Sequence, residues 1–133
     1  KVSKLPIKGK KLKNKNRFLN YLYIINNKNK TTINQRTAKG IWHNLYEFPL
    51  VETEILETDE VVLSLIRNEF KDIMDIILME TETITHKLSH QHLHIKFWKI
   101  KRNIILENGL DFETLNKFPF PIVLHNFIEN NKF

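Results

Sequence analysis

The sequence predicts a single-domain α/β (α+β) fold, in which a mixed β-sheet is packed against helices. Its 133 residues suit one hydrophobic core, because two domains of half that length would each bury too little apolar surface. Hydrophobic residues make up 41% of the chain, and strand-like runs alternate with segments of helical spacing. The sequence contains no cysteine, which excludes a disulfide scaffold, a thiol nucleophile and an iron–sulfur cluster held by this chain.

Charge is spread unevenly along the chain, although the net charge is +6. Residues 1–46 contain twelve Lys or Arg and no acidic residue, whereas residues 47–133 contain nine basic and fifteen acidic residues. We therefore expect any contact with a polyanion to be local. No run approaches the roughly eighteen apolar residues of a membrane-spanning helix. The chain begins with Lys rather than Met, which is typical of a piece of a longer protein.

Residues 1–17 are predicted to form a basic linker or arm, because they carry eight positive charges and no sustained apolar period. Two interpretations stay open: a solubilising tail, or an arm whose lysines contact phosphates. The aromatic and branched run at 18–25 predicts a strand. A polar turn at 26–29 followed by residues 31–33 predicts that this strand continues into a hairpin.

Residues 40–52 predict a loop that feeds a short strand, which Pro49 places near a sheet edge. Thr58 predicts the N-cap of a helix. Asp72 and Asp75 are expected on the solvent face of that helix. Its core-facing residues recur at helical spacing: Val62, Ile66, Phe70 and Ile73.

Residues 81–101 predict two strands around a break. The second strand is indicated by apolar residues at every second position, namely Leu93, Ile95 and Phe97. Asn108-Gly109 predicts a turn. Asp111 is expected to cap a short helix, and a last helix at 122–129 is expected to follow Pro121.

Four histidines form the densest cluster of candidate metal ligands: His86, His90, His92 and His94. In a strand, His92 and His94 would project to one face, and neutral imidazoles bind zinc or copper. No nearby carboxylate completes a ligand set. The alternative is that the histidines line a sheet face or a loop as hydrogen-bonding groups.

The loop-then-helix outline after Gly40 resembles the box of Nudix hydrolases without its metal-binding glutamates. That box needs a Glu six residues after the Gly and a Glu pair on a helix, which bind magnesium against a diphosphate. Here Tyr46 stands at the first Glu position, with Glu47 one residue late. The Arg-Glu and Glu-Glu positions hold Glu54, Ile55, Thr58 and Asp59. The resemblance predicts a Nudix-shaped domain without Nudix hydrolysis.

Three segments together resemble the C-terminal domain of adenine DNA glycosylases of the MutY family. Residues 35–49 contain Gln35-Arg36, Gly40-Ile41-Trp42 and Leu45-Tyr46-Glu47-Phe48-Pro49, which are similar to its QR…KGIW…LWEFP signature. Residues 86–90, with Leu93 and Trp98, resemble its H-x-F-S-H…L…W segment. Residues 5–8 resemble the linker into the domain. The resemblance extends over about residues 4–130.

The resemblance implies that residues 18–133 are the 8-oxoguanine-recognition domain of an enzyme that excises adenine mispaired with 8-oxoguanine. Catalysis would reside in an N-terminal helix-hairpin-helix domain with an iron–sulfur cluster, so no catalytic residue, metal or other cofactor is expected in this chain. The expected partners are double-stranded DNA carrying the mispair and the N-terminal domain, with no membrane. The expected location is the bacterial cytoplasm, at the nucleoid.

By the same resemblance, Leu88, Ser89 and His90 would contact the DNA and read the 8-oxoguanine. A serine hydroxyl or a backbone carbonyl accepts the N7 hydrogen of 8-oxoguanine, whereas guanine N7 is itself an acceptor. Leu88 stands where the family usually has Phe, so it can wedge beside a base but cannot stack on it. The candidate phosphate contacts are Lys8, Lys10, Lys11 and Arg36.

Three alternatives are left open by the residues. Arg36 either touches DNA or fixes the loop around Gly40. The whole domain could instead be a divergent Nudix hydrolase of oxidised nucleotides, for which the missing glutamates are unfavourable. It could also be a protein-interaction module whose basic arm docks an acidic partner. Four large aromatic residues are expected in the core: Trp42, Tyr46, Phe48 and Trp98.

Overall fold

The computed structural model describes residues 15–79 and 84–131. In chain order the elements are β1 (Lys15–Asn26), β2 (Asn34–Gln35), β3 (Tyr46–Glu47), β4 (Leu50–Thr53), α2 (Asp59–Glu69), β5 (Ile73–Leu78), β6 (Ile84–Lys87), β7 (Gln91–Arg102), α3 (Phe112–Leu115) and α4 (Ile122–Asn130). They form a five-stranded mixed sheet with helices packed on it, and β2 and β3 pair separately. The predicted fold class, a mixed α+β single domain, is confirmed.

The two longest strands, β1 and β7, lie side by side in parallel at the centre of the sheet. Their register runs from Lys15 opposite Gln91 to Asn26 opposite Arg102. β4 pairs antiparallel with the other side of β1, while β5 and β6 pair antiparallel with β7. The order β4–β1–β7–β5 leaves β4 at an edge, as Pro49 predicted.

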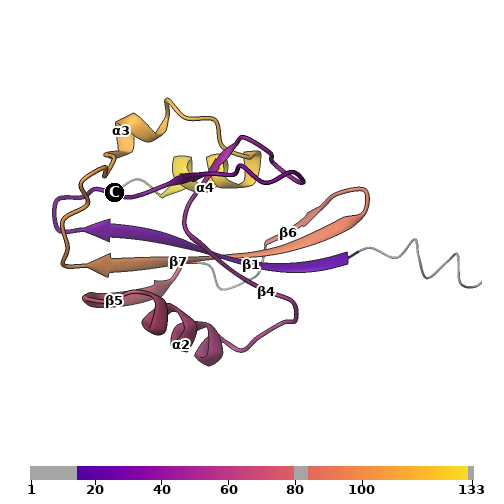
Figure 1. The fold of residues 1–133 in the computed structure, drawn as a ribbon, viewed down its shortest axis with the longest axis horizontal. Coiled ribbons are helices and arrows are strands. Elements are labelled where there is room, and N and C mark those ends of the chain that lie inside the picture. Colours follow the sequence, from indigo (N-terminus) through magenta and orange to yellow (C-terminus); the bar gives the residue numbers. More distant parts are fainter. Residues whose placement is uncertain (1–14, 80–83, 132–133) are drawn as a thin grey trace, which may run out of the picture.

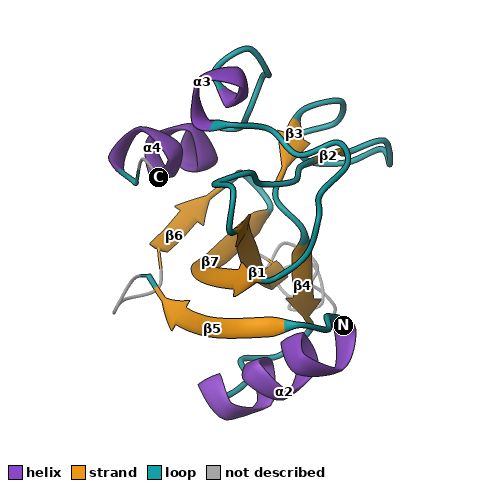
Figure 2. Cartoon of the chain, turned by 90° about the vertical axis from the view of Figure 1, so that its left-hand side faces the viewer, coloured by secondary structure: helices purple, strands orange, loops and turns teal. Residues whose placement is uncertain are grey.

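Helices cover both faces of this sheet: α2 lies on one face, and α3 and α4 lie on the other (Figures 1 and 2). Because side chains alternate along a strand, the odd-numbered residues of β1 pack toward α4 and the even-numbered ones toward α2. On the α4 side, the rings of Phe97 and Phe127 stack with centroids 3.9 Å apart. On the α2 side, buried Trp98 Nε1 donates to Asn20 Oδ1 at 3.0 Å.

Local capping signals position the helices as predicted. The hydroxyl of Thr58 accepts a hydrogen bond from the backbone N–H of Val61 at the start of α2. The carboxylate of Asp111 accepts from the backbone N–H of Thr114 in α3, at 2.9 Å. Pro121 stands at the N-terminus of α4, where a missing N–H costs nothing.

The prediction that the mid-chain helix runs on through Ile73 is wrong. The helix ends at Glu69, and Ile73 is the first residue of β5, a strand that the sequence pattern did not reveal. Asp72 lies in the turn between the two elements with φ 57°, and Asp75 lies in β5. The apolar residues at 73–78 fit the spacing of a helix as well as that of a strand. Their pairing with β7 therefore determines that they form a strand.

The predicted hairpin at 18–33 is also wrong. The side-chain oxygen of Asn26 accepts from the backbone N–H groups of Lys28 and Lys30, at 3.0 and 2.9 Å. This turn leads the chain away from β1, and Thr31 instead forms an isolated bridge with Leu110. The polar turn was therefore predicted correctly, but its strand partner was not.

The boundary predicted for the basic arm at residue 17 also shifts. β1 begins at Lys15, so residues 15–17 belong to the sheet. The candidate phosphate contacts Lys8, Lys10 and Lys11 lie outside the described residues. None of the helices in the described ranges is long and apolar enough to cross a membrane.

Candidate nucleic-acid interface

The predicted lesion-reading residues form the tip of the β6–β7 hairpin. The backbone N–H of Leu88 donates to the carbonyl of Gln91 at 2.7 Å, so Ser89 and His90 form the loop between the two strands. Both loop residues are exposed, whereas Leu88 is half-buried. Cross-strand pairing from Ile84 onward fixes the register below the loop. The structure thus presents a serine and a histidine at the end of a two-stranded ribbon.

Leu88 faces inward from this tip. It packs against the core cluster on the α4 side, where it shares the cluster with Ile41 and Trp42 of the loop around Gly40. The ring of Trp42 lies beside that of His86, with centroids 6.0 Å apart. The two segments that carry the resemblance in the sequence are therefore in contact, although more than forty residues separate these two rings in the chain.

The loop around Gly40 has an unusual backbone. Gly40 has φ 130°, a conformation that favours glycine, and no atom lies within 4 Å of the position its Cβ would take. Trp42 and Asn44 also have positive φ, at 56° and 69°. Such residues persist only where the surroundings hold them. Arg36 provides part of that support, because its backbone exchanges hydrogen bonds with Leu45 and Asn44 at 2.8 and 2.7 Å.

The side chain of Arg36 is bound within the domain. Its Nη1 donates to Glu47 Oε1 at 2.7 Å, and its Nε donates to the carbonyl of Ile41 at 3.3 Å. The hydroxyl of Tyr21 donates to the same Glu47 oxygen at 2.9 Å. Burial, reinforced by the Glu47 carboxylate, raises the pKa of Tyr21. Arg36 therefore fixes the loop, and its predicted phosphate contact stays a prediction.

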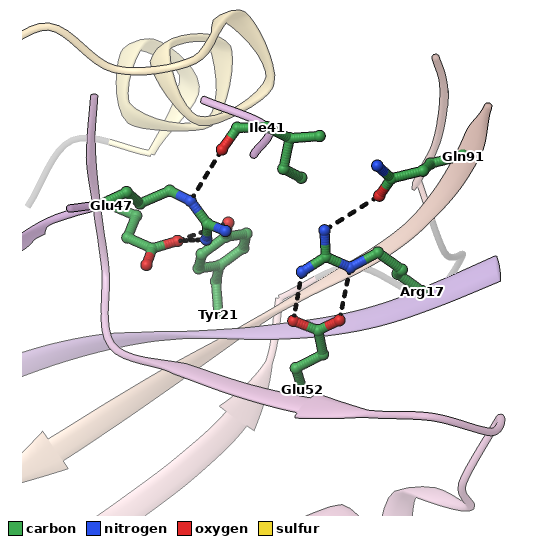
Figure 3. Close-up of polar contacts among 7 residues, drawn as sticks. Arg17, Tyr21, Ile41, Glu47, Glu52 and Gln91 are labelled. Carbon is green, nitrogen blue, oxygen red and sulfur yellow. Dashed lines mark hydrogen bonds and ion pairs between the residues drawn. The ribbon is translucent and has the colours of Figure 1, made fainter. Parts of the chain in front are cut away.

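The first residues of β1 flank the hairpin tip, which the sequence interpretation missed. The backbone N–H of Lys15 donates to the carbonyl of His90 at 3.1 Å. Arg17 Nη1 donates to Gln91 Oε1 at 3.0 Å, while Nε and Nη2 bind Glu52 at 2.7 and 2.8 Å (Figure 3). The sequence contains no signal for this contact, because the lysine-rich start of a strand has the same composition as a basic linker.

Comparison with known proteins places the fold in a family. A family model described as the NUDIX domain matches residues 20–130, which is most of the chain. The chain belongs to the Nudix domain family. A search of curated proteins found no match. The matched region runs from the middle of β1 to the end of α4 and includes the hairpin tip and the loop around Gly40.

The magnesium that the Nudix family implies finds no matching donor set among the described residues of this Nudix domain. Its helix α2 carries Asp59, Glu60 and Glu69, and Asp59 is paired with Lys96 at 2.9 Å. Glu52 is paired with Arg17. Across residues 15–79 and 84–131, no three His, Asp or Glu side chains gather as a metal site.

The histidine cluster is distributed over the hairpin instead of converging. His94 Nε2 lies 3.0 Å from Asn16 Oδ1, and its ring stacks on that of Phe18 with centroids 4.9 Å apart. His86 lies against Trp42 on the other face, and His90 is exposed in the loop. His86 therefore contacts an aromatic ring on one face of the sheet, and His94 stacks on a ring and contacts an amide on the other.

Proposed function

We propose that this Nudix domain reads 8-oxoguanine for an adenine DNA glycosylase, as the MutY-like motifs imply. The observation that supports the proposal is the hairpin tip, where Ser89 and His90 are exposed on a ribbon braced by β1. The major groove of duplex DNA is wide enough to admit a two-stranded β-ribbon. The enzyme would act in base excision repair in the bacterial cytoplasm, with its catalytic domain outside residues 1–133.

The chemistry of the lesion suits a serine at this position. 8-Oxoguanine carries a hydrogen on N7, and the hydroxyl of Ser89 can accept it. Guanine N7 offers only a lone pair, so a Ser89 hydroxyl whose own hydrogen is bonded to another acceptor, such as a DNA phosphate, would face it acceptor to acceptor. Discrimination by hydrogen bonding is effective because the wrong base leaves polar groups unpaired. Leu88 supports the loop from below, since it packs on the core instead of projecting as a stacking platform.

Excision kinetics of the whole glycosylase test this function. The ratio of excision rates for adenine opposite 8-oxoguanine and opposite guanine would be measured with wild-type protein and with Leu88→Ala plus Ser89→Ala. We expect the double variant to lose most of the preference for 8-oxoguanine. Ser64→Ala, an exposed serine on α2, is the matched control. An unchanged ratio in the double variant would refute the assignment of the loop.

A second candidate follows from the family itself: a divergent Nudix hydrolase of oxidised nucleotides. Membership of the Nudix family favours it, and the scattered carboxylates of α2 are unfavourable. Its test is magnesium-dependent release of pyrophosphate from 8-oxo-dGTP by the 133-residue chain. Activity that disappears in Glu69→Gln but persists in Glu107→Gln, an exposed loop control, would establish the hydrolase. We expect no release.

A further inference from the structure

The cations around the hairpin tip differ in whether a carboxylate neutralises them. Arg17 is paired with Glu52 and Arg36 with Glu47, each at 2.7 Å, so both guanidinium groups are compensated inside the domain. Lys87 follows a different pattern. It is exposed and forms no ion pair within the described ranges.

Lys15 is the second uncompensated cation at this end of the sheet. It is exposed, and no ion pair of its side chain occurs among residues 15–79 and 84–131. Lys15 lines a surface groove together with Glu52 and exposed Glu54, and the carboxylate of Glu52 is already paired with Arg17. The backbone of Lys15 is bonded to His90, so its side chain begins directly beside the loop.

The two lysines leave the sheet on opposite faces. Lys15 has the same parity in β1 as Leu19, whose side chain lies in the core cluster on the α4 side. Lys87 has the opposite parity in β6 to Ile84, which packs on that same cluster, so Lys87 projects to the α2 side. Figure 1 shows the start of β1 and the β6–β7 hairpin at one end of the sheet. The exposed Ser89-His90 loop therefore stands between two cations.

We propose that duplex DNA lies across this tip, with Lys15 and Lys87 each contacting phosphates of a different strand. The loop would sit in the groove between them, and a major groove about 12 Å wide accommodates such a ribbon. This inference rests on the proposed function, because it takes the lesion-bearing duplex as the ligand. Phosphate contacts fix orientation without reading sequence, so the two lysines set how the loop meets the base.

Salt-dependent binding of the 133-residue chain tests the proposal. Anisotropy of a labelled duplex with 8-oxoguanine opposite adenine, and of its guanine counterpart, would be measured over a range of salt concentrations. Lys15→Gln and Lys87→Gln should each weaken binding to both duplexes by the same factor. Each should reduce the slope of log K against log salt by about 0.9, and the double variant by about twice that.

The matched control is Lys101→Gln, an exposed lysine at the far end of β7. It pairs with Ile25, ten residues along β1 from Lys15, which corresponds to about 33 Å. For Lys101→Gln we expect the same slope of log K against log salt as for the wild-type chain. Slopes for Lys15→Gln and Lys87→Gln equal to that of the control would overturn the proposal. Absence of duplex binding, or equally tight binding of the single strand, would overturn it too.

Ser89→Ala in the same assay separates this proposal from the function on which it rests. If the lysine variants lower the slope while Ser89→Ala leaves the lesion preference unchanged, the phosphate contacts stand and the reading role fails. If Ser89→Ala reduces the preference while the lysine variants match Lys101→Gln, the reading role stands and the phosphate contacts fail. Circular dichroism of each variant verifies that the fold is retained.

Discussion

Arg17 binds both carboxylate oxygens of Glu52, with Nε–Oε2 at 2.7 Å and Nη2–Oε1 at 2.8 Å. Its third nitrogen donates to Gln91 at 3.0 Å, so one side chain of β1 joins β4 and β7 where the hairpin begins. The hydrogen bonds from Arg17 to the Glu52 carboxylate raise the pKa of Arg17, and partial burial opposes the shift. Because Gln91 directly follows the Ser89-His90 loop, this contact connects the sheet to the loop.

Replacing Arg17 with Met should lower the free energy of unfolding. The pair is partly exposed, at 17% for Arg17 and 33% for Glu52, so we expect a loss of about 1 kcal/mol. Denaturant unfolding measures it. Arg67→Met, an exposed arginine in the last turn of α2, is the control. An effect no larger than that of the control would show that the bidentate pair contributes nothing to stability.

Replacing Arg36 with Met should destabilise the domain more. The side chain of Glu47 is only 12% exposed, and in the variant its carboxylate would keep the hydrogen bond from the Tyr21 hydroxyl but lose the guanidinium. We expect a loss of about 2 kcal/mol in denaturant unfolding, with the salt slope of DNA binding unchanged. The opposite pattern, a slope lower by about 0.9 with stability retained, would instead make Arg36 a phosphate contact.

Tyr21 makes the domain sensitive to alkali. Burial, with the Glu47 carboxylate, raises the pKa of Tyr21, so the folded state keeps a proton that the unfolded chain loses above about pH 10. The stabilisation is complete below that pH and is lost as pH rises. Wild-type stability should therefore fall more steeply than that of Tyr21→Phe, by up to about 1.4 kcal/mol per pH unit. Identical alkaline slopes in urea unfolding would contradict this account.

Asp111 should contribute to stability at neutral pH but not in strong acid. The side chain and backbone N–H of Thr114 hold the pKa of Asp111 below its ordinary value. A lowered pKa means that the contribution is present above the ordinary value and is lost as pH falls through the folded value. Asp111→Ala should lower the Tm at pH 7, and the difference should vanish in acid. Glu107→Ala is the exposed control.

The elements that the sequence predicted correctly are those determined by neighbours in the chain. Thr58 and Asp111 cap their helices because the N–H groups that they bind lie three residues away. The alternation of Leu93 and Ile95 with polar residues identifies β7, since both side chains are fully buried on one face. Such signals require no knowledge of the remaining chain.

The errors in the predicted fold concern contacts between distant segments. The parallel pairing of β1 with β7 joins residues 76 positions apart, such as Lys15 and Gln91, and no local pattern encodes it. Ile73 fits the helical spacing of α2, yet its pairing with Arg102 places it in β5. The turn at Asn26 resembles a hairpin turn, but Thr31 bridges to Leu110.

The candidate site was predictable in part. The resemblance proposed Leu88, Ser89 and His90 as reading residues, which stays a prediction; the structure adds that these consecutive residues lie at a hairpin tip. The flanking role of Lys15 and Arg17 could not be predicted, because their partners lie 35 or more residues away and their own segment has the composition of a linker.

The most direct test of the central claim is the affinity of the 133-residue chain for two duplexes that differ only in 8-oxoguanine or guanine opposite adenine. We predict tighter binding to the 8-oxoguanine duplex. Ser89→Ala should reduce that preference about fivefold, the equivalent of one hydrogen bond of about 1 kcal/mol, and Ser64→Ala should leave it unchanged. Equal wild-type affinities for the two duplexes, or an undiminished preference in Ser89→Ala, would contradict a lesion-reading role for this hairpin.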